Sequence, residues 1–423
     1  MSTISYNKTV NMLVFLLPLM SLWITHAAST ILILLCMLGI GVWLSREKRI
    51  FFTWSEKAVM VSFAAILGMG LLSVPLHWIS ADIYQSDFQY DHELKLLAFI
   101  PIYYLFVHTK IKSETFWYGL CAGAIFAGVW SCVLSYILGT SERIAGAYNP
   151  ILVGDMAVAM GFAGLAGVQF FEKKHKATTL IPLVAVLMGM TAAFISATRA
   201  ALMAAPLLLV VFWIQIGKHP KAWRLRSLVF GLIIIVALSG YYFSDSNIDK
   251  RVRTGLQTMA ETLNGQPKNL EDATDFSTAA HFRLWKEAIG VIGEHPWIGV
   301  GDDGFGHIIR EKSNTDPSIK PIMKYDSTHN MYLQFMVIHG IPGLPVILAL
   351  YIFPLVYFIN WIRRSDEVRD VAYAGVAVVL SYMQFSLTES IMGRSVPIAL
   401  YVVLIAAAMS LCRKSGTKKS GAD

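Results

Sequence analysis

The sequence predicts an all-α membrane protein with about twelve transmembrane helices and one helical domain outside the bilayer. Of its 423 residues, 55% are apolar and only 15% are charged, whereas about 25% are charged in an ordinary soluble domain. The mean hydropathy is +0.55, and apolar runs long enough to cross about 30 Å of hydrocarbon recur along the chain. These features exclude a soluble or disordered protein. The net charge of +7 gives no reason to expect a nucleic-acid partner.

The apolar runs are separated by polar loops and predict the helices in order. The expected spans cover residues 10–26, 28–44, 57–79, 93–108, 115–138, 151–171, 178–196, 198–217, 226–243, 341–362, 371–391 and 395–412. We expect the first run to remain as an anchor rather than to be cleaved as a secretory signal, because the second run follows at once. An even number of spans places both termini on the same side of the membrane.

Lysine and arginine in the short loops predict the orientation of the bundle. The termini and one alternate set of loops hold 21 of the 35 basic residues, while the short loops of the opposite side hold only Arg143, Arg199 and Arg394. Basic loops stay on the cytoplasmic side, so we expect both termini to be cytoplasmic. The segment 244–328, with 10 basic and 13 acidic residues, then lies on the outer side.

This outer segment divides the chain into parts. We expect a bundle of about nine helices over 1–243, a loop domain over 244–328, a bundle of about three helices over 329–412 and a basic cytoplasmic tail over 413–423. Within the loop domain, apolar residues at helical spacing predict an amphipathic helix over 278–293 that ends at His295-Pro296. The residues of its predicted apolar face are Phe282, Trp285, Ala288, Ile289 and Ile292. A short helix over 329–339 then leads into the tenth span.

Four arginines are expected on the outer face, where an arginine at the membrane boundary is costly unless it is paired, snorkelling or facing a cavity. Arg199 stands in a very short turn between two apolar runs. It is either a snorkelling residue or a phosphate clamp, since guanidinium offers a planar fork that matches phosphate oxygens. Arg283 is close to the start of the amphipathic helix, where the helix dipole favours an anion. Arg143 could pair with Glu142, and Arg394 with Glu389.

His329 is the leading candidate for proton transfer. Imidazole has an unperturbed pKa of about 6.5 and can accept a proton near neutral pH. The residue stands where the outer segment enters a span, with Thr328 and Asn330 as possible orienting groups. Spacing alone does not exclude the rival histidines His281, His295, His307 and His339. The sequence contains no metalloprotease, phosphate-loop or serine-hydrolase motif, and its four cysteines lie in or beside apolar runs, so no metal site is expected.

Several short motifs in a fixed order resemble the O-antigen ligases. They are Thr198-Arg199, Phe282-Arg283-Leu284-Trp285, His295-Pro296-Trp297-Ile298-Gly299-Val300-Gly301 with Phe305, and Thr328-His329-Asn330 at the entry to a span. The resemblance covers nearly the whole chain in length, span count and loop position. The same larger group holds O-antigen polymerases and protein O-oligosaccharyltransferases.

The resemblance implies a GT-C-like glycosyltransferase at the periplasmic face of a Gram-negative inner membrane, with no metal or other cofactor. Such an enzyme takes O-antigen polysaccharide from undecaprenyl diphosphate and joins it, with inversion, to a sugar of lipid A-core in lipopolysaccharide biosynthesis. Arg199 and Arg283 match the family's arginines that hold the diphosphate, and His329 matches the histidine that deprotonates the acceptor hydroxyl. The further expected contacts of the diphosphate or glycan are Arg143, Asn330, Trp285 and Arg394. Membrane lipids are the remaining partners.

Two alternatives stay open. An O-antigen polymerase would use the same donor but a second glycan chain as acceptor. Arg143 followed by ten residues and Gly154 resembles one copy of the Arg-x10-Gly element of polymerases, and the sequence holds no second copy. A carrier or flippase of lipid-linked glycans would also have about twelve spans, but it would be expected to carry charges near the middle of the membrane.

Overall fold

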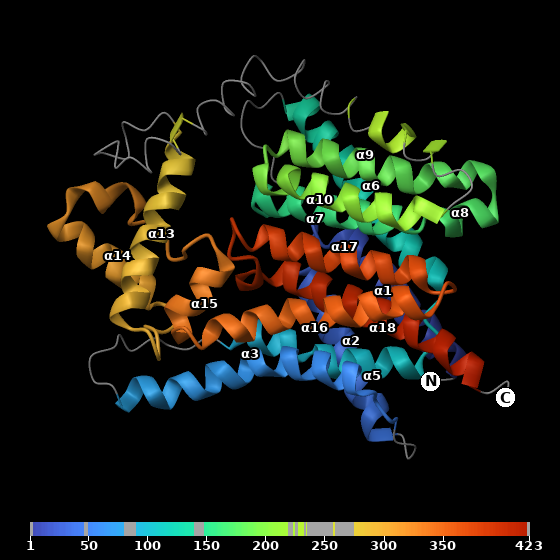
Figure 1. Ribbon diagram of the computed structural model, residues 1–423, viewed down its shortest axis with the longest axis horizontal. Coiled ribbons are helices and arrows are strands. Elements are labelled where there is room, and N and C mark those ends of the chain that lie inside the picture. The colour runs from blue at the N-terminus through green and yellow to red at the C-terminus, as the bar shows by residue number, and fades with distance from the viewer. Residues whose placement is uncertain are drawn as a thin grey trace.

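The computed structural model describes residues 3–45, 50–79, 90–138, 148–218, 223–224, 227–231, 234, 257–258 and 275–420. All regular secondary structure in these residues is helical, and they contain no strand. Figure 1 shows a bundle of long helices, with α13 (Phe276–Glu294), α14 (Gly304–Thr315) and α15 (Met331–His339) grouped at one end. The predicted all-α class is therefore confirmed.

The first half of the bundle follows the predicted apolar runs. Its helices are α1 (Thr3–Met20), α2 (Ala27–Ser45), α3 (Trp54–Ile79), α4 (Asp91–Leu97), α5 (Phe99–His108), α6 (Ser113–Leu138), α7 (Pro150–Leu165), α8 (Val168–Lys174), α9 (Leu180–Ile195) and α10 (Arg199–Gln215). Local signals fix some of these boundaries. The side chain of Asn149 accepts a hydrogen bond from the Ile151 N–H at 3.0 Å, and Pro150 takes the first helical position, where its missing N–H is not needed.

The second half of the bundle consists of α16 (Gly343–Arg364), α17 (Arg369–Phe385) and α18 (Ser395–Ser420). The first residues of the expected basic tail belong to α18, which continues to Ser420. Arg413 donates to both carboxylate oxygens of Glu56 on α3, at 2.6 and 2.7 Å, so the tail begins packed against the bundle. In Figure 1 both labelled chain ends lie at the end of the bundle opposite α13 and α14.

Among the described residues, fewer than twelve helices have the full length and hydropathy of a membrane span. Six described helices do so, and a seventh span arises if α7 and α8, bent by 52°, are taken as one. The predicted span 93–108 is broken at Ala98 into α4 and α5, and α10 and α17 have only 17 residues each. Most of the predicted span 226–243 lies outside the described residues. A helical multi-pass protein is confirmed, but the number twelve is not.

Glycines allow the central helices α6, α7 and α9 to approach closely. A Cβ on Gly189 would lie 2.6 Å from the Ala157 carbonyl oxygen, and a Cβ on Gly128 would lie 2.3 Å from the Met188 carbonyl oxygen. Both positions therefore require glycine, as is typical of membrane helices that pack through small residues. This closely packed side of the bundle carries the turn 196–198 between α9 and α10.

The outer segment has a hydrophobic cluster separate from that of the bundle. Leu284 of α13 and Phe305 of α14 are both fully buried in it. Ile319 of η4 (Pro317–Ile322) and Val337 of α15 are also buried members of this cluster. α15 leads into α16 after only three residues, so the outer segment is joined to the membrane bundle by a short connection.

The predicted range of the amphipathic helix agrees with α13, but its predicted face was only partly right, because Ala288 is buried and Ile289 is not. The residues of α13 that are buried are Ala279, Ala280, Leu284, Ala288 and Val291. Ile289, expected to face inward, is 61% exposed. Three of these buried residues are alanines, whose small side chains allow close approach to neighbouring helices. A prediction weighted toward large apolar residues gives such alanines too little weight.

Candidate active site

His329 occupies a tight turn immediately before α15. Its φ of 50° lies in the left-handed region, which is uncommon for residues other than glycine. The Thr328 N–H donates to Gln334 Oε1 at 2.8 Å, and the Thr328 hydroxyl donates to the Asn330 carbonyl oxygen at 2.8 Å. These contacts hold the turn in place. Backbone conformations of this kind persist where the surroundings determine them, and they cluster at functional sites.

Three further side chains surround the imidazole ring of His329. Its Nδ1 lies 3.2 Å from Oε2 of Glu389, on the connection between α17 and α18. The ring of His281 on α13 stacks on it with centroids 5.1 Å apart, and the ring of Tyr325 meets it edge-on at 5.3 Å. We call His281, Tyr325, His329 and Glu389 the histidine cluster. It is built where the outer segment meets the bundle.

Burial and charge together set the protonation of the histidine cluster. Burial acts to raise the pKa of Glu389, but the hydrogen bond and charge of His329, with the charge of Arg394, hold that pKa below its usual value. Burial, together with the neighbouring His329, lowers the pKa of His281 to about 4. At neutral pH, His329 therefore lies between an ionised carboxylate and a neutral imidazole.

Arg199 begins α10 and reaches α13. Its Nη1 donates to Asp275 Oδ2 at 2.6 Å and to Thr278 Oγ1 at 2.8 Å, while half of the side chain remains exposed. Thr278 and His281 are three residues apart on α13 and therefore share one face of the helix. Arg199 and His329 thus contact the same face of α13.

The turn that presents Arg199 packs against α7. A Cβ on Gly154 would lie 2.5 Å from Thr198 Oγ1 and 2.7 Å from Ser196 Oγ, so glycine is required there. The two hydroxyl oxygens are themselves 2.7 Å apart. Gly154 is the glycine of the Arg-x10-Gly element noted in the sequence, and the structure gives it a packing role.

Arg283 contacts a different part of the outer segment. Its Nε lies 3.1 Å from Glu287 Oε1, and its Nη2 lies 3.1 Å from Asp316 Oδ2. Two residues along an α-helix are roughly 200° apart around its axis, so Arg283 and His281 lie on opposite faces of α13. The structure therefore brings Arg199 to the face that carries the histidine cluster, but it does not bring Arg283 there.

Two of the further predicted contacts lie beside the histidine cluster. Trp285 shares the α13 face of His281, with ring centroids 6.3 Å apart, and within the described residues its buried Nε1–H has no hydrogen-bond partner. Arg394 is exposed and interacts electrostatically with Glu389. Its expected ion-pair partner, Glu389, contacts His329 instead.

The remaining two predicted contacts are Asn330, which caps a helix, and Arg143, which lies outside the described residues. The side-chain oxygen of Asn330 accepts from the N–H groups of Tyr332 and Leu333, and its amide donates to the Leu387 carbonyl oxygen at 3.0 Å. Asn330 therefore caps α15 and ties it to the end of α17.

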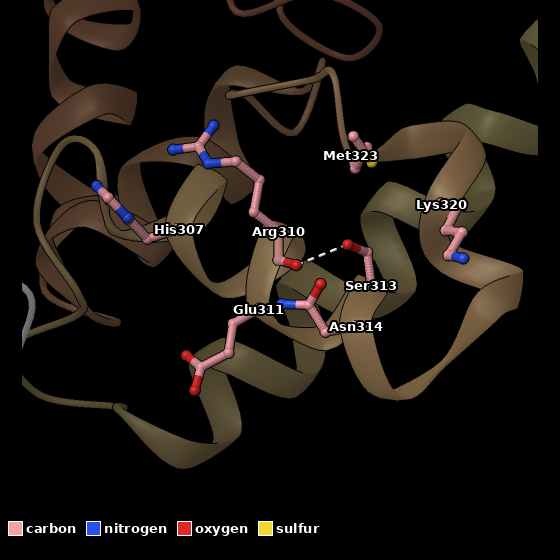
Figure 2. Close-up of a pocket in the computed structure, with 7 residues that line it drawn as sticks. All are labelled: His307, Arg310, Glu311, Ser313, Asn314, Lys320 and Met323. Carbon is pink, nitrogen blue, oxygen red and sulfur yellow. Dashed lines mark hydrogen bonds between the residues drawn. The ribbon is translucent and has the colours of Figure 1, made fainter.

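Among the rival histidines, only His281 belongs to the histidine cluster. His339 ends α15 and is 3% exposed, and His295 follows the last residue of α13. His307 lines an open pocket of about 640 Å³ together with Arg310 and Lys320 (Figure 2). None of the predicted catalytic residues lines this pocket, which is formed by α14 and η4.

Charge at the candidate site comes from side chains. In the described part of the chain, no three or more His, Cys, Asp or Glu residues are grouped so that they could hold a metal ion. The carboxylate of Glu389 contacts His329, and the guanidinium of Arg199 contacts Asp275 and Thr278 beside the α13 face that carries His281. The arrangement can accept a proton at His329 and stabilise an anion at Arg199.

Comparison with known proteins identifies a family model that matches the middle of the chain. Residues 183–348 match the family model Wzy_C, described as O-antigen ligase. The match includes Arg199, Arg283 and His329, whereas Glu389 lies beyond it. An uncharacterized protein of Haemophilus influenzae is 24% identical over 392 residues, which cover 92% of this chain and 94% of that protein. The resemblance noted in the sequence is confirmed: the chain is a multi-pass membrane protein whose residues 183–348 match the O-antigen ligase family model.

Proposed function

We propose that the protein is an O-antigen ligase, which transfers O-antigen polysaccharide from undecaprenyl diphosphate to a lipid A-core sugar, with inversion and without a metal. One observation carries the proposal. His329 is held against the buried carboxylate of Glu389, and Arg199 contacts the same face of α13 as His329. The site therefore contains a proton acceptor, His329, and a cation, Arg199.

In the proposed reaction, His329 removes the proton from the acceptor hydroxyl as the acceptor oxygen attacks the anomeric carbon of the donor. The bond from that carbon to the diphosphate oxygen breaks at the same time, so undecaprenyl diphosphate departs with the electron pair. Inverting transfer needs a general base and stabilisation of the leaving group. Arg199 cannot act as the base, because guanidinium stays protonated.

Arg199 is the proposed contact of the departing diphosphate. Its Nη1 is engaged by Asp275 and Thr278, but guanidinium has five N–H donors and half of this side chain is exposed. Arg283 enters the proposal through the family resemblance, because its described contacts lie on the opposite face of α13. Trp285, Arg143 and Arg394 remain proposed contacts of the glycan or diphosphate.

The proposed location is a Gram-negative inner membrane, with the termini cytoplasmic and the histidine cluster periplasmic. The distribution of basic residues supports this orientation, as does Figure 1, in which the chain ends lie opposite α13 and α14. We propose the same four-part division of the chain at residues 243, 328 and 412, with a GT-C-like architecture. The donor is a lipid, so we expect it to reach the site from the outer leaflet.

Reconstitution tests the function directly. Purified protein in liposomes is supplied with lipid-linked O-antigen and lipid A-core in the presence of a chelator, and glycan joined to lipid A-core is measured. We expect ligation with chelator present. Extension of one glycan chain by another, without transfer to lipid A-core, would instead identify a polymerase, and movement of the donor between leaflets without any transfer would identify a carrier.

A further inference from the structure

We propose that Glu389 is a positioning residue for the transfer reaction, which holds His329 in the tautomer that can accept the proton of the acceptor hydroxyl. The inference rests on the proposed function, because it assigns a role in the same site. It adds a residue that lies 60 positions from His329 and outside the region matched by the family model.

The contact between Glu389 and His329 has a defined polarity. An ionised carboxylate has only acceptors, so the proton between Glu389 Oε2 and His329 Nδ1 must belong to the imidazole. The other carboxylate oxygen, Oε1, accepts from the Ser390 N–H at 3.3 Å. A carboxylate that is only 3% exposed requires such partners, because an unpaired buried charge is strongly unfavourable.

This polarity leaves Nε2 as the basic atom of His329. In a neutral imidazole one nitrogen carries the proton and the other carries the lone pair. With Nδ1 donating to Glu389, the lone pair is on Nε2, which has no hydrogen-bond partner in the part of the chain that the structure describes. The His281 ring covers one face of the His329 ring, and the Tyr325 ring contacts it edge-on. The side chain is 14% exposed, so a substrate can reach it.

The backbone on both sides of the contact is fixed. The Met331 N–H donates to the Ser386 carbonyl oxygen at 2.8 Å, and the Tyr332 hydroxyl donates to the Met383 carbonyl oxygen at 2.8 Å. The start of α15 is therefore attached to the end of α17, only a few residues before Glu389. The positive φ of His329 directs the ring from this fixed turn. The contact between His329 and Glu389 is thus fixed by the packing of the backbone on both sides.

Glu389 is a charged group in direct contact with the His329 ring. A nearby negative charge stabilises imidazolium and raises the pKa of a histidine. Several other charged or titratable groups interact electrostatically with Glu389 or His281. They are His329, Arg394, Asp155, Arg199 and Asp275. Tyr325 contacts the ring of His329. Glu389→Gln removes the negative charge that faces Nδ1 of His329, while these other groups remain in place.

The test combines a kinetic and a chemical measurement on the full-length protein in liposomes. Ligation rates are measured over a pH series for wild type, Glu389→Gln and Glu389→Asp. Glu294→Gln is the matched control, because it removes one carboxylate charge from an exposed position at the end of α13. In parallel, the pH dependence of His329 modification by diethyl pyrocarbonate is followed by peptide mass spectrometry without donor or acceptor. This second measurement does not depend on the proposed function.

For Glu389→Gln we expect kcat to fall by about 10²-fold or more with little change in KM for the donor. The acid limb of the rate profile and the midpoint of His329 modification should both move to lower pH, because the negative charge beside the ring is lost. Glu389→Asp, which keeps the charge, should be faster than Glu389→Gln, with both midpoints close to those of wild type. Glu294→Gln should match wild type.

An unchanged His329 midpoint in Glu389→Gln would overturn the positioning role, even if the rate fell. The same conclusion follows if Glu389→Asp moves the midpoint as far as Glu389→Gln does, because the charge would then not be responsible. If the midpoint moves as expected while the wild-type protein ligates nothing, the pairing stands and the proposed function fails.

Discussion

Arg199, at the start of α10, and Asp275, immediately before α13, form an ion pair in which Nη1 and Oδ2 are 2.6 Å apart. Asp275 also accepts hydrogen bonds from the N–H groups of Ser277 and Thr278, and so caps α13. Burial acts to raise the pKa of Asp275, but the hydrogen bonds from Arg199 and Thr278 hold it below its usual value. Arg199 is therefore tied to the outer segment and does not simply snorkel at a helix end.

The first prediction concerns the geometry of Arg199. Lysine keeps the positive charge but lacks the planar fork that matches phosphate oxygens, so Arg199→Lys should be severely impaired in ligation. Arg199→Ala should lose about 3 kcal/mol or more of transition-state stabilisation, the scale for one preorganised donor. Both are measured as kcat/KM at equal protein level in the membrane.

Arg310 offers a matched control for this prediction. It forms an ion pair of the same 2.6 Å length with Asp326, and its side chain is similarly exposed. Arg310→Lys should ligate like wild type. Equal activity of Arg199→Ala and wild type would remove Arg199 from the site.

The second prediction separates two roles of Arg283. It pairs with Glu287 within α13, and its contacts with Asp316 and Ser318 join α13 to η4. We expect Arg283→Ala to lower the unfolding free energy of the outer segment by about 1–3 kcal/mol, because hydrogen bonds to charged groups are lost. Thermal unfolding of the purified protein measures this effect.

Ligation by Arg283→Lys then tests the second role, since lysine retains the charge within the outer segment. If Arg283 holds the diphosphate, this variant should stay folded and yet have a strongly raised donor KM. A folded Arg283→Lys protein with wild-type kinetics would leave Arg283 with a structural role alone.

The third prediction concerns pH. Because the pKa of His281 is about 4 in the folded protein and about 6.5 when unfolded, the unfolded chain binds this proton first as the pH falls. Stability should therefore decrease between about pH 6.5 and pH 4, by on the order of 3 kcal/mol. Thermal unfolding over this range should show the decrease in wild type but a smaller one in His281→Phe.

His307→Phe is the control for the pH prediction, because His307 is exposed on α14. Its pH dependence should follow that of wild type. An identical loss of stability in His281→Phe and wild type would mean that His281 is not the group responsible.

Much of the fold could be predicted because the membrane imposes length and composition on each helix. The apolar runs at 28–44, 115–138 and 395–412 correspond closely to α2, α6 and α18. The break at Ala98 had a local signal, because Pro101 has no N–H to bond the Leu97 carbonyl at the end of α4. The continuation of α18 beyond Cys412 could not be predicted, since it involves the ion pair between Arg413 and Glu56, which are 357 residues apart.

The candidate site could be predicted only in part. His329 stood out by its place at the entry to a span, but its partner Glu389 was expected to pair with Arg394, which is nearer in sequence. The sequence alone does not show that the turn with His329 packs against the connection with Glu389. The opposite placement of His281 and Arg283 could have been inferred, since residues two apart on a helix do not share a face.

The fourth prediction concerns topology. With 21 of 35 basic residues in the termini and one set of loops, both termini should be cytoplasmic and the outer segment periplasmic. Alkaline phosphatase fused after Ser246 should be active, and the same reporter after Lys414 should be inactive. Activity at Lys414 would place the histidine cluster on the wrong side for the proposed substrates.

The most direct test of the account is the His329→Ala variant in the purified system, with ligation rate and donor affinity measured separately. A lost general base typically lowers the rate by about 10² to 10⁴-fold. We expect a loss of that size while the affinity for lipid-linked O-antigen stays within a few-fold of wild type, because His329 acts on the acceptor. Ligation that survives within a few-fold, or donor binding that falls in step with the rate, would contradict the assignment of His329 as the base.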